Sequence, residues 1–163
     1  MNQSFTIPKF TLPGFVAQLG ARLPQWPHSL SLVCGLNIAR KLGVMPVDTL
    51  AELDGRTFRV SVLDTGGVAD FTVQNGVFKP LLKESGAPDL HFSANVSAFL
   101  QLLTRQEDPD TLFFNRQLTV EGDTELGLLV KNMLDAMDWS MVTDSLSRLP
   151  LPGALKSRLG AAH

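Results

Sequence analysis

The chain of 163 residues has no tyrosine, two tryptophans and a single cysteine, Cys34. One cysteine cannot close an internal disulfide, which fits a reducing compartment such as the cytoplasm. Because Cys34 follows Leu32 and Val33 in an apolar stretch, we expect a buried thiol that acts as a small hydrophobic side chain rather than as a nucleophile.

Charge and catalytic motifs are equally sparse. The formal net charge is -2, and no basic block could neutralise a run of phosphates, which argues against nucleic acid as the main partner. His28, His91 and His163 are scattered, with no pair spaced for a metal, and His91 is expected to face solvent. Without a nucleophile elbow or a glycine-rich phosphate loop, we expect a non-catalytic protein that needs no cofactor or metal. The alternative is an enzyme whose catalytic site is formed by residues far apart in the sequence.

Long hydrophobic runs are also missing. Pro8, Lys9 and Pro13 interrupt the apolar residues near the start, so we expect neither a signal peptide nor a membrane-spanning segment. Nevertheless 44% of the residues are hydrophobic and only 18% are charged, with a mean hydropathy of +0.11. In a soluble chain of this size, polar surface residues should make up a larger share. Some apolar side chains are therefore expected either to stay exposed or to line a cavity.

The length suits one domain with an arm at each end. In the first arm, Leu30, Val33, Leu36 and Leu42 predict one apolar side of a helix that ends at Gly43. The expected parts are an N-terminal helical, apolar arm over residues 1–45, a central domain over residues 46–138 and a C-terminal helical tail over residues 139–163.

The central domain begins with strand patterns. Residues alternate between apolar and polar from Phe58 to Val62, and Asn75-Gly76 is typical of a type I′ hairpin turn. Further strands are expected near residues 69–73, 77–80, 90–94 and 118–121. With the helices expected between and after them, these strands predict an α+β domain: a five-stranded, mainly antiparallel sheet with helices covering one face, preceded by N-terminal helices.

Two helices are expected in the second half of this domain. The first begins near Asn95, and the second is capped by Asp123. Carboxylates such as Asp123 could in principle bind a cation, but capping is the favoured interpretation. Gly127 lies in the middle of the second helix, which indicates either close packing against a strand or ligand, or an indifferent surface position.

A longer motif carries a resemblance. The segment DPDTLFFNRQLTVEGDTELGLLVKNMLDAMD, with DLHFSAN upstream, resembles the sterol carrier protein-2 (SCP2) family, and within it the bacterial ubiquinone biosynthesis accessory factors. The likeness covers roughly residues 48–138. It implies a lipid-binding module whose sheet and helices enclose a hydrophobic cavity, acting in oxygen-independent (anaerobic) ubiquinone biosynthesis.

The resemblance also implies partners. The protein would hold isoprenoid quinone intermediates or phospholipid, and would work beside peptidase-like ubiquinone hydroxylation accessory proteins of the UbiU and UbiV type. The expected location is the cytoplasm, with a peripheral contact to the inner membrane left open. A general lipid carrier, or a membrane-surface scaffold using Phe5, Phe10, Phe15 and Trp26, is the alternative.

Candidate ligand-lining residues lie on the inward-facing apolar sides of adjacent elements, and those of the second helix are three or four residues apart and share one face. They include aromatic and methionine types that adapt to a flexible chain. They are Phe99, Leu103, Phe113, Phe114, Leu126, Leu129, Val130 and Met133. Ordinary core packing is the competing interpretation of each one. Lys131 and Arg116 could meet a lipid phosphate at the cavity mouth, although solvated surface charges are the simpler interpretation.

Overall fold

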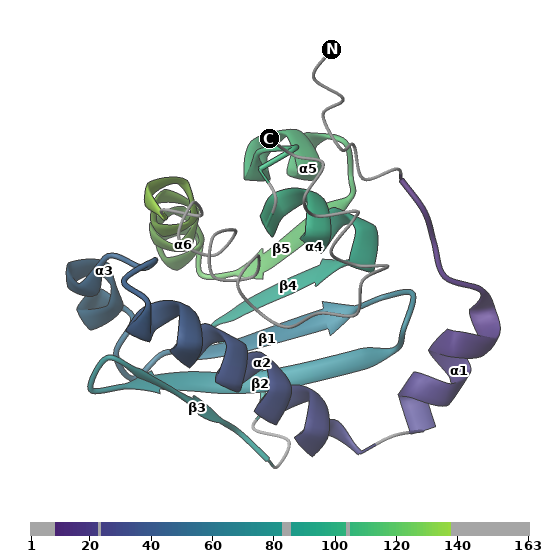
Figure 1. The fold of residues 1–163 in the computed structure, drawn as a ribbon, viewed down its shortest axis with the longest axis horizontal. Coiled ribbons are helices and arrows are strands. Elements are labelled where there is room, and N and C mark those ends of the chain that lie inside the picture. Colours follow the sequence, from purple (N-terminus) through teal and green to yellow (C-terminus); the bar gives the residue numbers. More distant parts are fainter. Residues whose placement is uncertain (1–8, 23, 83–85, 104, 138–163) are drawn as a thin grey trace, which may run out of the picture.

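The computed structural model describes residues 9–22, 24–82, 86–103 and 105–137 (Figure 1). The tail expected at residues 139–163 and Phe5 lie outside the described residues. The elements, in chain order, are α1 (Gly14–Arg22), α2 (Gln25–Lys41), α3 (Val47–Glu52), β1 (Thr57–Val62), β2 (Gly67–Gln74), β3 (Val77–Pro80), β4 (Leu90–Ala94), α4 (Val96–Leu103), α5 (Pro109–Phe114), β5 (Leu118–Gly122) and α6 (Thr124–Ala136).

The five strands form one sheet in the order β3-β2-β1-β4-β5. Three of the four neighbouring pairs are antiparallel, and β1 and β4 run parallel. The predicted α+β fold with a mainly antiparallel sheet is therefore confirmed. Asn75 and Gly76 have φ angles of 53° and 68°, as the expected type I′ turn requires, and Pro80 ends the edge strand β3.

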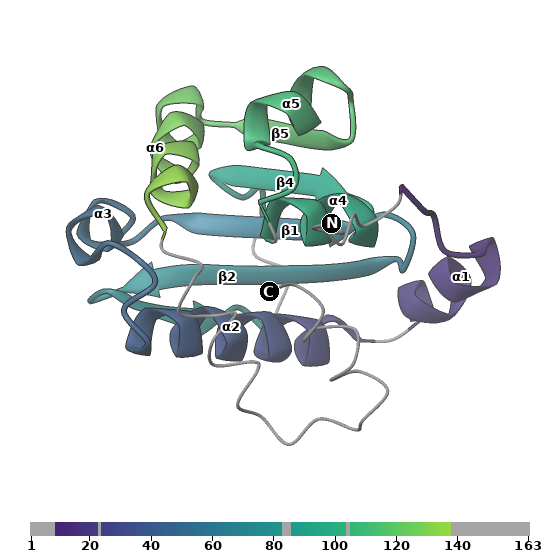
Figure 2. The same ribbon diagram turned by 45° about the horizontal axis from the view of Figure 1, so that its top comes forward.

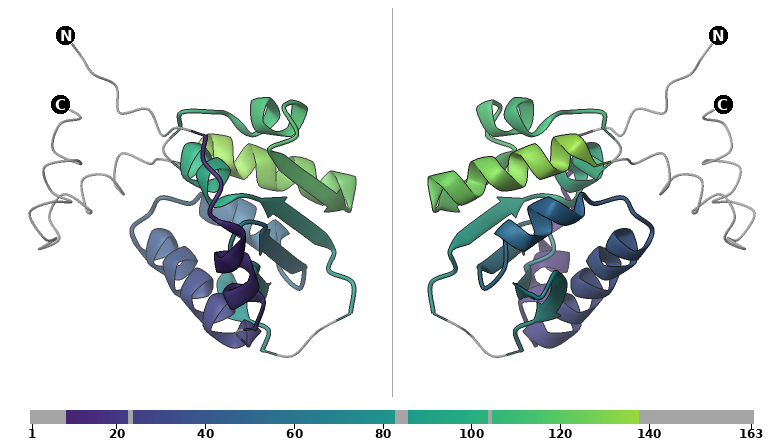
Figure 3. Two further views of the ribbon diagram at one scale, coloured as in Figure 1. Left: turned by 90° about the vertical axis from the view of Figure 1, so that its right-hand side faces the viewer. Right: turned by 90° about the vertical axis from the view of Figure 1, so that its left-hand side faces the viewer.

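Strand register separates a dry face of the sheet from a polar one. Phe58 pairs with Phe71 and with Leu90, and Val60 pairs with Phe92, so apolar side chains line up across the strands. Helix α2 runs along the β2 side of the sheet, while α4, α5 and α6 lie toward β4 and β5 (Figures 1 and 2). Figure 3, which views the sheet from its ends, shows α2 on one side of the strands.

The core on the dry face has two parts. The larger is built from buried side chains of α2, α3, β1 to β4 and α6, together with the segment before α3, and the smaller lies under α4 and α5. Phe92 and Val120 are only partly buried and pack against both parts. They therefore lie on the dry face between the larger and the smaller core part.

Helix α2 does not bury all of the apolar side that its leucines predict. Val33 is 5% exposed, but Leu30 and Leu42 are 43% and 40% exposed, so the predicted apolar side is wrong at both ends. Cys34 is exposed as well, against the expectation of a buried thiol. Successive helix positions are about 100° apart, so when Val33 faces the core its neighbour Cys34 faces solvent.

The buried side of α2 instead carries polar groups that bind strand backbone. The Ser29 hydroxyl is fully buried and accepts a hydrogen bond from the Asp70 backbone N–H at 3.0 Å. The Asn37 side chain bonds the backbone of Phe78 in β3. Helix α2 thus covers the open edge of the sheet, where unpaired N–H and C=O groups would otherwise remain.

Candidate functional site

Half-buried apolar side chains from α2, the strands, α4 and α6 pack against the two core parts of the dry face. We call this set of residues the apolar stripe. Its members are Leu32, Leu36, Val60, Phe92, Phe99, Leu102, Val120, Leu129 and Leu134. Residues such as Val73, at 0% exposure, show how completely other parts of this face are buried. The apolar stripe is therefore the part of the dry face most available to an apolar ligand.

A groove of about 290 Å³ opens at one end of the apolar stripe, between α2 and the sheet. We call it the α2 groove. It is lined by His28, Ser31, Leu32, Val60, Val62, Thr65, Gly67, Val68 and Ala69. Leu32 and Val60 belong to both the groove and the stripe, so the two surfaces are continuous.

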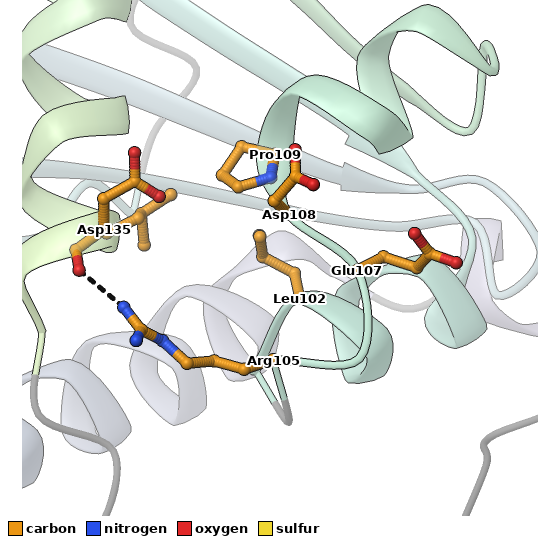
Figure 4. Close-up of a pocket in the computed structure, with 7 residues that line it drawn as sticks. Leu102, Arg105, Glu107, Asp108, Pro109 and Asp135 are labelled. Atoms are coloured by element: carbon orange, nitrogen blue, oxygen red, sulfur yellow. Dashed lines mark hydrogen bonds between the residues drawn. The ribbon is translucent and has the colours of Figure 1, made fainter.

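A second pocket, of about 250 Å³, lies at the other end, where Leu102 of α4 and Leu134 of α6 contribute apolar walls. Its rim is polar. The Arg105 guanidinium donates to the backbone carbonyl of Asp135, and Glu107 and Asp108 complete the rim (Figure 4). The stripe therefore runs between an apolar groove and a polar-rimmed pocket.

The rim carboxylate of Asp108 serves as a helix cap. It accepts hydrogen bonds from the Thr111 backbone N–H at 2.8 Å and from the Thr111 hydroxyl at 2.7 Å. These two bonds lower the pKa of Asp108 below its ordinary value, the backbone bond contributing most. An acid held in its ionised form by a cap is poorly suited to donate protons.

The eight candidate lining residues do not gather around one cavity. Leu126, Val130 and Met133 are buried in the larger core part. Phe99 and Leu129 belong to the apolar stripe. Leu103, Phe113 and Phe114 are 46%, 49% and 80% exposed, so the expectation that these three side chains point inward is wrong.

Other charged residues of the motif also have structural partners. Asp123 accepts from the backbone N–H groups of Glu125 and Leu126 at 2.9 and 3.1 Å, as expected for the cap of α6. Lys131 contacts Asp110 at 2.6 Å, and this bond raises the lysine pKa. Across the described residues, no group of three or more acidic, histidine or cysteine side chains could hold a metal ion.

His91 lies on the polar face of the sheet, opposite the apolar stripe. Its Nε2 lies 2.9 Å from the Ser61 hydroxyl and 3.1 Å from that of Ser93, and its Nδ1 lies 3.5 Å from Glu121. The side chain is 27% exposed, which agrees with its expected place on the wet face. The Nε2 atom therefore has two hydroxyl partners, and Nδ1 makes the longer contact with Glu121.

Sequence reasoning missed three polar residues of α2. His28 lines the α2 groove, while Ser29 and Asn37 fix the helix to the sheet edge. Ser29, Val33 and Asn37 recur every four residues, so they share one helix face. That spacing was visible in the sequence, but a search for apolar periodicity passes over it.

Comparison with known proteins then settles the family. Residues 47–135, more than half of the chain, match the model described as the SCP-2 sterol transfer family. The chain belongs to this family. A solved UbiJ-SCP2 ubiquinone synthesis protein has the same fold, with a TM-score of 0.54 and 18% identity, covering 67% of this chain and 97% of that one.

Closer sequence relatives carry one name. The chain is 40% identical over 102 residues to the ubiquinone biosynthesis accessory factor UbiT of Escherichia coli (strain K12), and equally to UbiT of Escherichia coli O157:H7. Each match spans 63% of this chain and 58% of the relative. The predicted resemblance is thereby confirmed. In the described part of the chain, no helix is long and apolar enough to cross a bilayer.

Proposed function

We propose that the protein is a non-catalytic lipid-binding accessory factor of oxygen-independent ubiquinone biosynthesis, which holds an isoprenoid quinone intermediate or another lipid on its apolar stripe. The 40% identity to UbiT carries the proposal of a role in ubiquinone biosynthesis. The apolar stripe, between two openings at its ends, supports the proposal of a lipid ligand.

The energetics favour such a ligand. A polyprenyl chain offers apolar surface, and its burial contributes about 0.8 kcal/mol per methylene. The stripe consists of aliphatic and aromatic side chains, which offer apolar surface for such a chain to cover. Shape and dryness are sufficient for binding, and no reacting group is needed.

The eight candidate residues have different roles in this proposal. Phe99 and Leu129 would contact the ligand directly. Leu126, Val130 and Met133 would support the stripe from the core behind it. Three candidate side chains are exposed: Leu103, Phe113 and Phe114. They would contact either the part of the ligand that extends beyond the stripe or the surface of a bilayer.

Partners and location follow from the same relationship. We propose that the protein works in the cytoplasm beside peptidase-like hydroxylation proteins of the UbiU and UbiV type. Because a polyprenyl ligand resides in the membrane, a peripheral contact with the inner membrane would allow transfer. This contact would be transient, since binding must be reversible for the ligand to reach the hydroxylating proteins.

Exposed apolar side chains near the start favour a second function, a membrane-surface scaffold. Phe15, Leu19 and Trp26 are 65%, 66% and 52% exposed. Lys9 and Arg22 are the cations close to them in sequence, so attraction to anionic lipid would be weak. If this function is correct, deleting residues 1–20 abolishes flotation with liposomes but leaves any bound ligand in place.

Deletion of the gene tests the favoured function. Ubiquinone should fall in cells grown without oxygen and persist in cells grown with it. A plasmid copy of the wild-type gene should restore the quinone. Unchanged ubiquinone under both conditions would refute the assignment to the pathway.

A further inference from the structure

The outward face of α2 carries almost no charge. Among the α2 residues whose exposure the structure describes, the exposed ones are Trp26, Leu30, Ser31, Cys34, Gly35, Ile38 and Lys41. Lys41 is the single charged residue in this set. A helix that faces water normally presents charged and polar side chains on that side, so the outward face of α2 is unusual for a surface helix.

The large apolar side chains of this face form a row. Leu30, Ile38 and Leu42, the residue that follows the helix, are 43%, 52% and 40% exposed. With the exposed Cys34 they recur every four residues, so they lie next to one another along the helix. We call these four residues the outer row of α2. Single exposed apolar residues are normal, whereas a contiguous apolar surface marks a site of interaction.

The distribution of charge indicates what covers the outer row. Residues 1–47 contain four cations and no acidic residue, while residues 48–163 have a formal charge of -6. The four cations are Lys9, Arg22, Arg40 and Lys41. Two copies that met through α2 would bring these like charges together, which disfavours a homodimer. A negatively charged surface would instead attract the α2 side and repel the remainder of the molecule.

The outer row also lies beside the α2 groove. Ser31 is an exposed residue of the same helix face, and it lines the groove. Leu32, the next residue, lines the groove and belongs to the apolar stripe. A surface that covers the outer row therefore lies next to the groove through which an apolar ligand would reach the stripe.

We propose that the outer row of α2 docks on an anionic bilayer and so places the α2 groove at the lipid surface, where the ligand enters. This inference rests on the proposed function and names the surface through which the ligand is exchanged. A bilayer with anionic lipids offers a negative surface, an apolar interior and the ligand itself. Helix α2 would lie in the membrane plane, with the outer row at the boundary between headgroups and acyl chains.

Flotation of the full-length protein with liposomes tests the inference. The wild type should float with liposomes that contain phosphatidylglycerol, and several-fold less with liposomes of phosphatidylcholine alone. The double variant Leu30→Gln/Ile38→Gln should lose most of this flotation, because two apolar contacts become polar. Both positions are exposed, so circular dichroism should show an unchanged fold.

Two double variants serve as matched controls. Leu82→Gln/Leu128→Gln changes leucines that are 56% and 58% exposed outside α2, and it should float like the wild type. Phe15→Gln/Leu19→Gln changes exposed side chains of α1 and should also keep flotation. The membrane-surface scaffold, which uses side chains near the start, predicts that this second control loses it.

The outcomes separate this inference from the proposed function. Flotation that persists in Leu30→Gln/Ile38→Gln overturns the inference, as does equal loss in all three double variants. A folded wild type that floats with neither kind of liposome overturns it too, as does a wild-type dimer that Leu30→Gln/Ile38→Gln converts to a monomer. None of these results depends on the lipid that co-purifies. A wild type that floats but carries no lipid would instead overturn the proposed function and leave the docking surface standing.

Discussion

The side chain of Asn37 bonds both backbone groups of Phe78. Its Nδ2 donates to the Phe78 carbonyl at 2.8 Å, and its Oδ1 accepts from the Phe78 N–H at 3.1 Å. Since Phe78 lies in the edge strand β3, the amide takes the place that another strand would occupy. These bonds hold α2, and with it one wall of the α2 groove, against the sheet.

Replacing Asn37 by alanine should therefore lower the free energy of unfolding by about 1–3 kcal/mol, because two backbone groups lose their partner. Urea unfolding measures the change. Cys34→Ala is the control, since this residue is exposed on the same helix and should change little. Equal stability of Asn37→Ala and Cys34→Ala would contradict the role given to the amide.

The contact between Asn37 and Phe78 also shows what the sequence could and could not predict. Alternation and the Asn75-Gly76 turn were sufficient to predict the strands, because these signals are local. The attachment of α2 depends on Asn37 reaching residue 78, a contact between distant parts of the chain. Helix α3 was not expected at all, since six residues are too few for a clear helical period.

The candidate site was predicted less well for a related reason. Spacing correctly assigned Leu126, Val130 and Met133 to one buried face of α6. The hydrophobic side chains of Phe113 and Phe114 predict burial, but α5 buries only Leu112. Helix α5 is six residues long, so its orientation depends on tertiary packing that the sequence pattern does not reveal.

Gly127 gives a prediction of increased stability. A Cβ atom there would lie 3.7 Å from Leu90 and 3.8 Å from Val120, which is ordinary contact. Gly127→Ala should therefore raise the free energy of unfolding by up to about 1 kcal/mol through helix propensity. Thermal unfolding measures the shift.

Gly122 is the contrasting position. It has a φ of +123°, and an added Cβ would lie 2.2 Å from the Asp89 carbonyl. Gly122→Ala should destabilise the fold. If both alanine variants destabilise it, the packing assigned to Gly127 is wrong.

Asp89 should make stability depend on pH. Hydrogen bonds from the Thr57 backbone N–H at 2.7 Å and the Thr57 hydroxyl at 2.8 Å, with a smaller contribution from Arg56, lower the pKa of Asp89 below 3.8. The ionised carboxylate thus stabilises the fold above the unfolded pKa, and this stabilisation is lost as pH falls through the lower folded pKa.

Asp89→Asn tests this dependence. The variant should be less stable than the wild type at pH 7, and the difference should shrink as pH falls below about 4, the ordinary value for aspartate. Urea unfolding at several pH values measures it. A difference that is the same at pH 7 and pH 3 would mean that the charge of Asp89 is unimportant.

Filling the apolar stripe should remove the ligand while keeping the fold. Leu32 is half-buried and lines the α2 groove, so Leu32→Trp places a larger side chain in the ligand's space. The lipid that co-purifies should fall several-fold, as mass spectrometry of an organic extract would show. Leu128→Trp, at a position that is 58% exposed on α6, should leave the lipid content unchanged.

A core substitution should behave differently. Met133 is 7% exposed within the larger core part, so Met133→Asp should unfold the domain by burying an unpaired charge. Circular dichroism separates this loss of structure from loss of ligand. A folded Met133→Asp variant would show that the core is less tightly packed than the structure indicates.

The most direct test is to identify what the wild-type protein carries. The protein should be purified without detergent from cells grown without oxygen, extracted with organic solvent and analysed by mass spectrometry. We expect close to one isoprenoid quinone precursor or other lipid per chain. Folded wild-type protein that releases no lipid would contradict the account.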